Sequence, residues 1–100
     1  MIVNMSRFGT ALSTRASGRG AYAFVNSESN GFSVPMEFDF SGVDTVSNSF
    51  SDELFGRMAF ELGMDRLRTI TSFSNVKPLA ARIIRSSMDA RDSQRNLIPA

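Results

Sequence analysis

The side chains that carry most enzyme chemistry are missing from this sequence. Its 100 residues contain no His and no Cys, which excludes Ser-His-Asp triads, thiol nucleophiles, disulfides and the usual zinc ligands. Only carboxylates, hydroxyls, Lys and Arg remain, and they form no recognisable catalytic pair. We therefore expect a protein that is not an enzyme and that holds no cofactor and no metal.

Four acidic residues in the middle of the chain are the candidates for cation binding: Asp39, Asp44, Asp52 and Glu53. Their spacing matches no EF-hand pattern. Three of them have structural explanations, and only Asp44, in a predicted loop, lacks one. The sequence therefore predicts no metal site.

A short basic segment, with Arg15, Gly18 and Arg19, begins a predicted helix near the start of the chain. Helix starts of this kind can bind phosphate, so the segment is a candidate site for phosphate or a nucleotide. It lacks the GxxxxGK[ST] pattern of a P-loop, and an ordinary helix start with solvated arginines is the simpler interpretation. With Asp44, it defines an alternative function as a small-ligand or nucleotide-binding domain.

The overall charge gives no sign of a nucleic-acid or membrane partner. Eleven basic and ten acidic residues leave a net charge of +1, too small for a general attraction to polyanions. The basic residues Lys77, Arg82, Arg85 and Arg91 lack interleaved exposed aromatics, so we expect a solvated helix face. No apolar run is long enough for a signal peptide or a membrane span. We therefore expect a cytoplasmic protein.

Alternating strands and helices must position these side chains. Hydrophobic periodicity predicts extended pieces at 2–3 and 8–12, strands at 36–40 and 67–73, and helices at 14–29, from 49 to 63 and from 75 onward. This order favours a small mixed or largely parallel sheet covered by about three helices. The predicted fold is a single α/β domain, residues 1–91, followed by a flexible C-terminal tail, residues 92–100.

The middle helix has the clearest start, because Ser49 is a suitable N-cap and Asp52 completes a pattern like a capping box. Its inward face is formed by Leu54, Phe55, Met58, Ala59 and Leu62. Phe60 points away from that face, so it is a candidate anchor for a partner or for a second copy in a homodimer. The alternative is an ordinary isolated surface residue, or one covered by the N-terminal segment.

The last helix begins with Asn75 as the predicted N-cap and Pro78 in its first turn. Its apolar residues at helical spacing are Val76, Leu79, Ala80, Ile83, Ile84 and Met88. We expect all of them to face the core.

Two motifs carry a family resemblance: FDFSGV at Phe38–Val43 and SFSDELFG at Ser49–Gly56. The chain resembles the STAS-like domain family of unassigned function, found in bacteria and phages, over roughly Ile2 to Met88. The resemblance implies a fold related to the anti-sigma-factor antagonists. Those proteins are non-enzymatic switches that bind a histidine-kinase-like ATP-binding protein and are released by phosphorylation of one Ser. The implied partner is a protein of that class.

Aligned with the antagonists, Asp39, Ser41, Val43 and Val46 match, and Ser49 falls on the phosphorylated serine. The chain departs from their pattern at three neighbours, Ser47, Asn48 and Phe50. A phosphate on Ser49 would lie at a helix start, where free N–H groups favour it, and beside acidic side chains that repel it. The alternative is that Ser49 is only an N-cap, and both roles are compatible.

These considerations predict a regulatory protein–protein interaction module. Its predicted contact surface comprises Asp44, Thr45, Ser47, Asn48, Ser49, Phe50, Glu53 and Phe60. An inhibitor encoded by a phage or mobile element, which would also act by binding a protein, is a further alternative.

Overall fold

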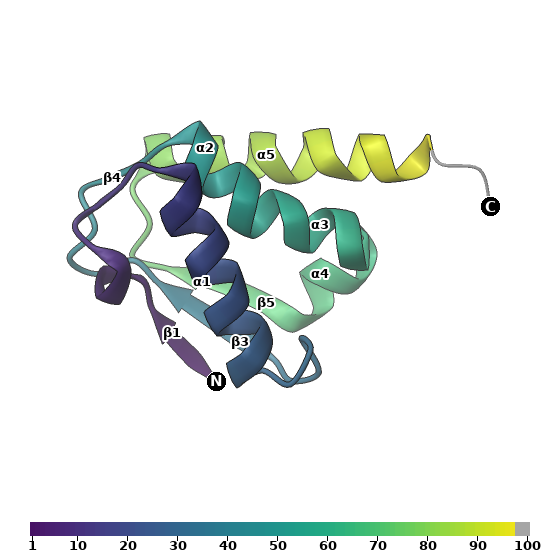
Figure 1. Ribbon diagram of the computed structural model, residues 1–100, viewed down its shortest axis with the longest axis horizontal. Helices are drawn as coiled ribbons and strands as arrows, with labels where there is room; N and C mark the ends of the chain where they lie inside the picture. The colour runs from purple at the N-terminus through teal and green to yellow at the C-terminus, as the bar shows by residue number, and fades with distance from the viewer. Residues whose placement is uncertain (98–100) are drawn as a thin grey trace.

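The computed structural model describes residues 1–97 and has two layers, with a small parallel sheet below and the helices packed together on one side of it (Figure 1). The elements in chain order are β1 (Ile2–Asn4), η1 (Met5–Phe8), β2 (Ala11–Leu12), α1 (Arg15–Glu28), β3 (Met36–Asp39), β4 (Thr45–Val46), α2 (Asn48–Ser51), η2 (Asp52–Gly56), α3 (Arg57–Leu62), α4 (Met64–Ile70), β5 (Thr71–Ser74) and α5 (Pro78–Asn96). This arrangement confirms the predicted α/β class.

The main sheet has three parallel strands in the order β1-β3-β5. Val3 pairs with Phe38, and Phe38 pairs with Phe73. A second, two-stranded parallel sheet joins β2 to β4. The extended piece predicted at 2–3 is confirmed as β1, whereas the piece predicted at 8–12 is a strand only at Ala11–Leu12, because Phe8 belongs to η1. Each of the two strands pairs with a later strand.

In the part of the chain that the structure describes, residues 1–97, helices cover one face of the main sheet and leave the other open. Along β3, Met36 and Phe38 are buried, whereas Glu37 and Asp39 are partly exposed. The uncovered face carries Glu37, which pairs with Ile2 of β1 on one side and with Ser72 of β5 on the other. Ile2 is 64% exposed. Parallel sheets usually have both faces covered, so this sheet is unusual in leaving one face open.

The core under the helices is built from Phe side chains. The ring of Phe38 lies 5.1 Å from that of Phe55 and 5.6 Å from that of Phe73. Phe40 packs against the same two rings. Aromatic pairs at these distances add to the burial of apolar area, so this cluster fixes the middle helix above β3 and β5.

Helix α1 begins where the sequence predicts. The Thr14 hydroxyl accepts a hydrogen bond from the N–H of Ser17 at 3.0 Å, which satisfies one of the free donors of the first turn. The helix ends before Asn30 and Gly31, both in the left-handed conformation.

The middle helical segment, residues 48–62, runs without a break through α2, η2 and α3, and η2 is a π-helical turn. Its N-cap is Ser47, whose Oγ accepts a hydrogen bond from the N–H of Phe50 at 3.1 Å. Our assignment of Ser49 as the N-cap was wrong, because the N-cap lies two residues earlier, at Ser47. The capping role of Asp52 is wrong for the same reason.

The strand predicted at residues 67–73 is half helix. Helix α4 starts directly after Gly63, which has a φ of 80°, and β5 begins only at Thr71. The Leu, Thr and Ile residues of this segment suit a strand by composition, but Leu67 lies in helix α4 and its side chain is buried there. Local β-propensity was overridden by tertiary packing.

Helix α5 differs from the prediction at both ends. Pro78 is its first residue, and Asn75 lies outside it, in a left-handed conformation, with its amide donating to Asp39 at 2.9 Å. Residues 92–96, assigned to a flexible tail, continue the helix. Arg95 donates to the carbonyl oxygen of Phe60 at 2.6 Å. Residues 98–100 of the predicted tail lie outside the described residues.

The apolar face of α5 is narrower than expected. Ala80 and Ile84 are buried, but Leu79 is 64% exposed. Within residues 1–97, no helix combines the length and the apolar character needed to cross a membrane.

Candidate interaction site

The segment from the end of β3 through α2 holds most of the predicted contact residues on a fixed backbone. The Asp44 N–H donates to the carbonyl oxygen of Thr10 at 2.7 Å, and the Ser47 N–H donates to that of Leu12 at 2.8 Å. Val43 and Val46 are buried below the segment. These contacts hold the loop against β2, so its outward side chains have defined positions.

The start of this loop explains one of the family motifs. Asp39 Oδ1 accepts hydrogen bonds from the Ser41 N–H and from the Asn75 amide, each at 2.9 Å. The Asn75 amide, and then Ser41, lower the pKa of the Asp39 carboxyl. Gly42 has a φ of 81°, which favours glycine. Asp39 and Gly42 therefore shape the turn.

Four predicted contact residues form a loop surface, which we define as Asp44, Thr45, Asn48 and Ser49. The first three are exposed and Ser49 is half-buried. The Asp44 side chain is 74% exposed and lies 3.5 Å from the Lys77 ammonium. The loop surface is polar, uncharged in its middle and accessible from solvent.

Three other predicted contact residues have internal roles. Phe50 is fully buried, so its assignment to the contact surface was wrong: it lies four residues before Leu54, on the same buried helix face. The half-buried Ser47 donates to the carbonyl oxygen of Ser13 at 2.9 Å in addition to capping α2. The side chain of Glu53 is only 13% exposed and binds Arg15.

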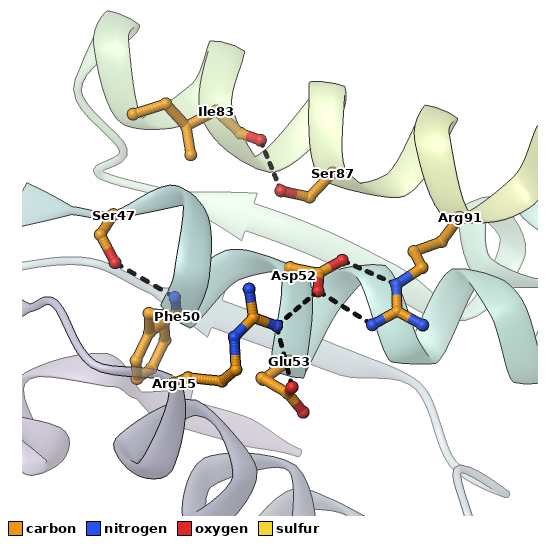
Figure 2. A network of polar contacts seen from close by, with 8 residues as sticks. All are labelled: Arg15, Ser47, Phe50, Asp52, Glu53, Ile83, Ser87 and Arg91. Atoms are coloured by element: carbon orange, nitrogen blue, oxygen red, sulfur yellow. Dashed lines mark hydrogen bonds and ion pairs between the residues drawn. The ribbon is translucent and has the colours of Figure 1, made fainter.

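Asp52 is the centre of a polar network that joins three helical segments (Figure 2). Arg91 of α5 donates two hydrogen bonds to its carboxylate, at 2.7 and 2.9 Å. Arg15 of α1 donates to the same carboxylate at 2.7 Å and to Glu53 at 2.9 Å. The Arg91 hydrogen bonds, followed by those of Arg15, lower the pKa of Asp52 to about 2 against the opposing effect of partial burial. The network therefore contains two carboxylates and two guanidinium groups, so its charges balance, and it holds α1 and α5 to the middle helical segment.

The structure gives two residues of the predicted phosphate site other roles. The guanidinium of Arg15 is engaged by Asp52 and Glu53. Gly18 is buried, and a Cβ there would lie 2.7 Å from the Phe50 carbonyl oxygen. Gly18 therefore permits close contact between α1 and the middle helical segment, whereas Arg15 and Arg19 are both exposed. The three residues form no phosphate cradle.

Phe60 is half-buried and does not belong to the main core cluster. The helix face at Gly56, one turn before Phe60, is covered, since a Cβ on Gly56 would lie 2.9 Å from the Arg91 side chain and 3.4 Å from the Ser87 carbonyl oxygen. Helix α5 covers this part of the middle helical segment. Phe60 therefore offers a partner less surface than the sequence suggested.

Comparison with known proteins supports the family resemblance. Residues 33–79 match the family model of a STAS-like domain of unknown function (DUF4325). This part of the chain is STAS-like. The STAS-like segment contains β3, the loop surface, the middle helical segment and β5, so both motifs lie within it. It points to a regulatory type of module. No curated protein and no solved structure matches the chain.

Sequence reasoning assigned Arg91 to a solvated helix face and missed its role in binding Asp52. Arg91 is four residues after Ser87, and both lie against Gly56. A glycine in the middle of an amphipathic helix was the available signal, because it permits a second helix to approach closely. Within residues 1–97, no group of three or more acidic side chains is arranged to hold a metal ion.

Proposed function

We propose that this chain is a non-enzymatic regulatory module that binds another protein through the loop surface. The observation that supports this proposal is the contrast between a fixed backbone and accessible side chains: Val43 and Val46 are buried, while Asp44, Thr45 and Asn48 are exposed. A pre-ordered surface loses little conformational entropy when a partner binds. The resemblance to the anti-sigma-factor antagonists makes a histidine-kinase-like ATP-binding protein the proposed partner.

The proposed switch is phosphorylation of Ser49. Its side chain is half-buried in the first turn of α2, so a phosphate there would change both the shape and the charge of the loop surface. The nearby carboxylates of Asp52 and Glu53 are paired with Arg15 and Arg91. Because this pairing balances their charge, they would repel a phosphate less than the sequence alone suggests.

Affinity capture from the native host tests the loop surface. We expect wild-type protein to recover a partner that Asn48→Arg loses, because the added side chain would cover the exposed start of α2. The matched control is Asn26→Arg, which adds the same charge near the other end of α1, where Asn26 is exposed. If both variants recover the same proteins as wild type, the loop surface is not the binding site.

Intact-mass analysis of the protein from its native host tests the switch. We expect a phosphorylated fraction under some growth condition that Ser49→Ala abolishes, and weaker partner capture by Ser49→Asp than by wild type. If the protein is not phosphorylated at Ser49 under any growth condition, the proposed switch is excluded and the chain would be a constitutive binding module.

Phe60 supports a narrower proposal, association with a partner or a second copy. We expect Phe60→Glu to keep the fold, since Phe60 lies outside the core cluster, and to reduce the mass measured by light scattering or the recovery of a partner. An unchanged mass together with unchanged recovery would assign Phe60 to packing within the chain.

The alternative small-ligand or nucleotide-binding function finds less support in the geometry. Arg15 is paired with carboxylates, and Asp44 lies beside Lys77. We expect no change in melting temperature with ATP or GTP. A clear rise with one nucleotide would reverse this ranking. The alternative of an inhibitor encoded by a phage or mobile element also requires protein binding, so the capture experiment covers it.

A further inference from the structure

An apolar groove of about 350 Å³ lies between α4, β5 and α5, away from the loop surface. Its apolar lining includes Met64, Leu67, Phe73, Val76, Ile84 and Met88. The volume is at the lower end of the range for ligand sites in proteins. Four of these side chains, Met64, Phe73, Val76 and Met88, are partly buried around the core cluster, so the groove is an accessible extension of the core.

The groove lies beside an edge strand. Within residues 1–97, β5 pairs with β3 alone and is the last strand of the sheet. The helices pack in the order α1, middle helical segment, α5, so α5 lies above the β5 side of the sheet. One edge of the β5 main chain therefore faces away from the sheet, and an edge of this kind can pair with an extended segment of another chain.

Two arginines flank the groove from opposite sides. Arg68 belongs to α4 and Arg85 to α5, and both line the groove and are exposed. Among residues 1–97, neither guanidinium makes a side-chain hydrogen bond or an ion pair; Asp89, four residues after Arg85, forms no ion pair with it. The groove therefore combines an apolar floor with two positive charges that form no ion pair within the described part of the chain.

We propose that this groove and the free edge of β5 bind an extended segment of another protein that carries acidic and apolar side chains. The segment adds to β5 as a fourth strand, places an apolar side chain in the groove, and pairs acidic side chains with Arg68 and Arg85. Main-chain pairing provides affinity in this mode, and the adjacent pocket provides specificity. A small amphipathic carboxylate would satisfy the charges, but it would leave the strand edge unpaired, so the peptide is favoured. This proposal is independent of the loop surface.

Selection from a display library of random peptides of about eight residues, a typical strand length, against the full chain tests the proposal. We expect the enriched peptides to contain at least one acidic residue among alternating apolar residues. One enriched peptide is then synthesised with a fluorescent label, and its binding is followed by anisotropy. N-methylation of the peptide nitrogens that face β5 should abolish binding, whereas N-methylation of the alternate nitrogens should not.

The charge requirement is tested with Arg68→Glu combined with Arg85→Glu, which should weaken binding of that peptide by at least about tenfold. The matched control is Arg19→Glu combined with Arg82→Glu, which makes the same charge change at exposed positions outside the groove. The control should change the affinity by less than about twofold at physiological ionic strength, because distant exposed charges are screened. Ala81→Phe, which narrows the groove and keeps both arginines, is the second variant if the charge reversal unfolds the protein.

Several outcomes would overturn the proposal. These are enriched peptides without acidic residues, equal binding to the charge-reversed and wild-type proteins, or binding that is insensitive to N-methylation. Failure to enrich any peptide would also overturn it. If laurate then raises the melting temperature of wild type but not of the charge-reversed variant, the groove is a site for a small amphipathic carboxylate.

Discussion

The substitution Asp52→Asn tests whether the polar network stabilises the fold. It keeps the size of the side chain but removes the charge between Arg15 and Arg91, which lie at 2.7 Å from the carboxylate. The pKa of Asp52 is about 2 against its ordinary 3.8, a difference that corresponds to about 2 kcal/mol of stability at neutral pH. The side chain is only 28% exposed, so solvent screens this contribution weakly. We expect Asp52→Asn to lower the free energy of unfolding by about 2 kcal/mol.

The pH dependence provides the sharper check. Because the pKa of Asp52 is lowered in the folded state, its contribution is complete above pH 3.8 and is lost as the pH falls toward 2. The free energy of unfolding can be measured at each pH by urea unfolding. Unfolding is followed by far-UV circular dichroism, because the chain has no tryptophan for fluorescence. The difference in free energy of unfolding between wild type and Asp52→Asn should have its full value at neutral pH and should become smaller below about pH 4.

Asp44→Asn is the matched control, since its exposed pair with Lys77 should contribute less than about 1 kcal/mol. A neutral-pH loss for Asp52→Asn no larger than that of the control would refute our account of the network. If the difference in free energy of unfolding between wild type and Asp52→Asn stays constant as the pH falls below about 4, our account is refuted as well. Protonation of Asp52 in wild type removes the same charge that the substitution removes, so the difference should become smaller.

Two further pairs of variants test local geometry, each by thermal and urea unfolding. Gly18→Ala should destabilise the protein by about 1–3 kcal/mol, because the new Cβ would lie 2.7 Å from the Phe50 carbonyl oxygen. Gly20→Ala, with nothing within 4 Å of the new Cβ, should stabilise α1 by up to about 1 kcal/mol; the opposite order would contradict the packing. Ser47→Ala should cost about 0.5–2 kcal/mol as the lost N-cap, whereas Ser49→Ala should cost less than about 0.5 kcal/mol. Equal costs would show that Ser47 is not the cap.

The elements with strong periodicity were predictable from the sequence. Helix α1, strand β3 and the apolar face of the middle helical segment lie where their patterns indicate, because burial of a continuous apolar face dominates over local propensity. The error at Phe50 came from starting the helix at Ser49. Counting back four residues from Leu54 would have placed Phe50 on the buried face, so the signal was present and was outweighed by an incorrect cap.

The contacts that organise the site could not be read from the sequence. Asp52 and Arg91 are 39 residues apart, and nothing local to either residue indicates the pairing. The division of residues 64–74 into α4 and β5 also depends on packing, since the same Leu, Thr and Ile residues suit either structure. The groove depends on that division, because α4 provides one of its walls.

The position of α5 has a consequence for dividing the chain into fragments. The span that matches the STAS-like family ends at residue 79, but Ala80 and Ile84 are buried and Arg91 binds Asp52. A recombinant fragment cut at the end of the matched span would expose the apolar surface beside Gly56 and leave Asp52 with one arginine. The smallest autonomous folding unit therefore extends through most of the last helix, well past the span that matches the family model.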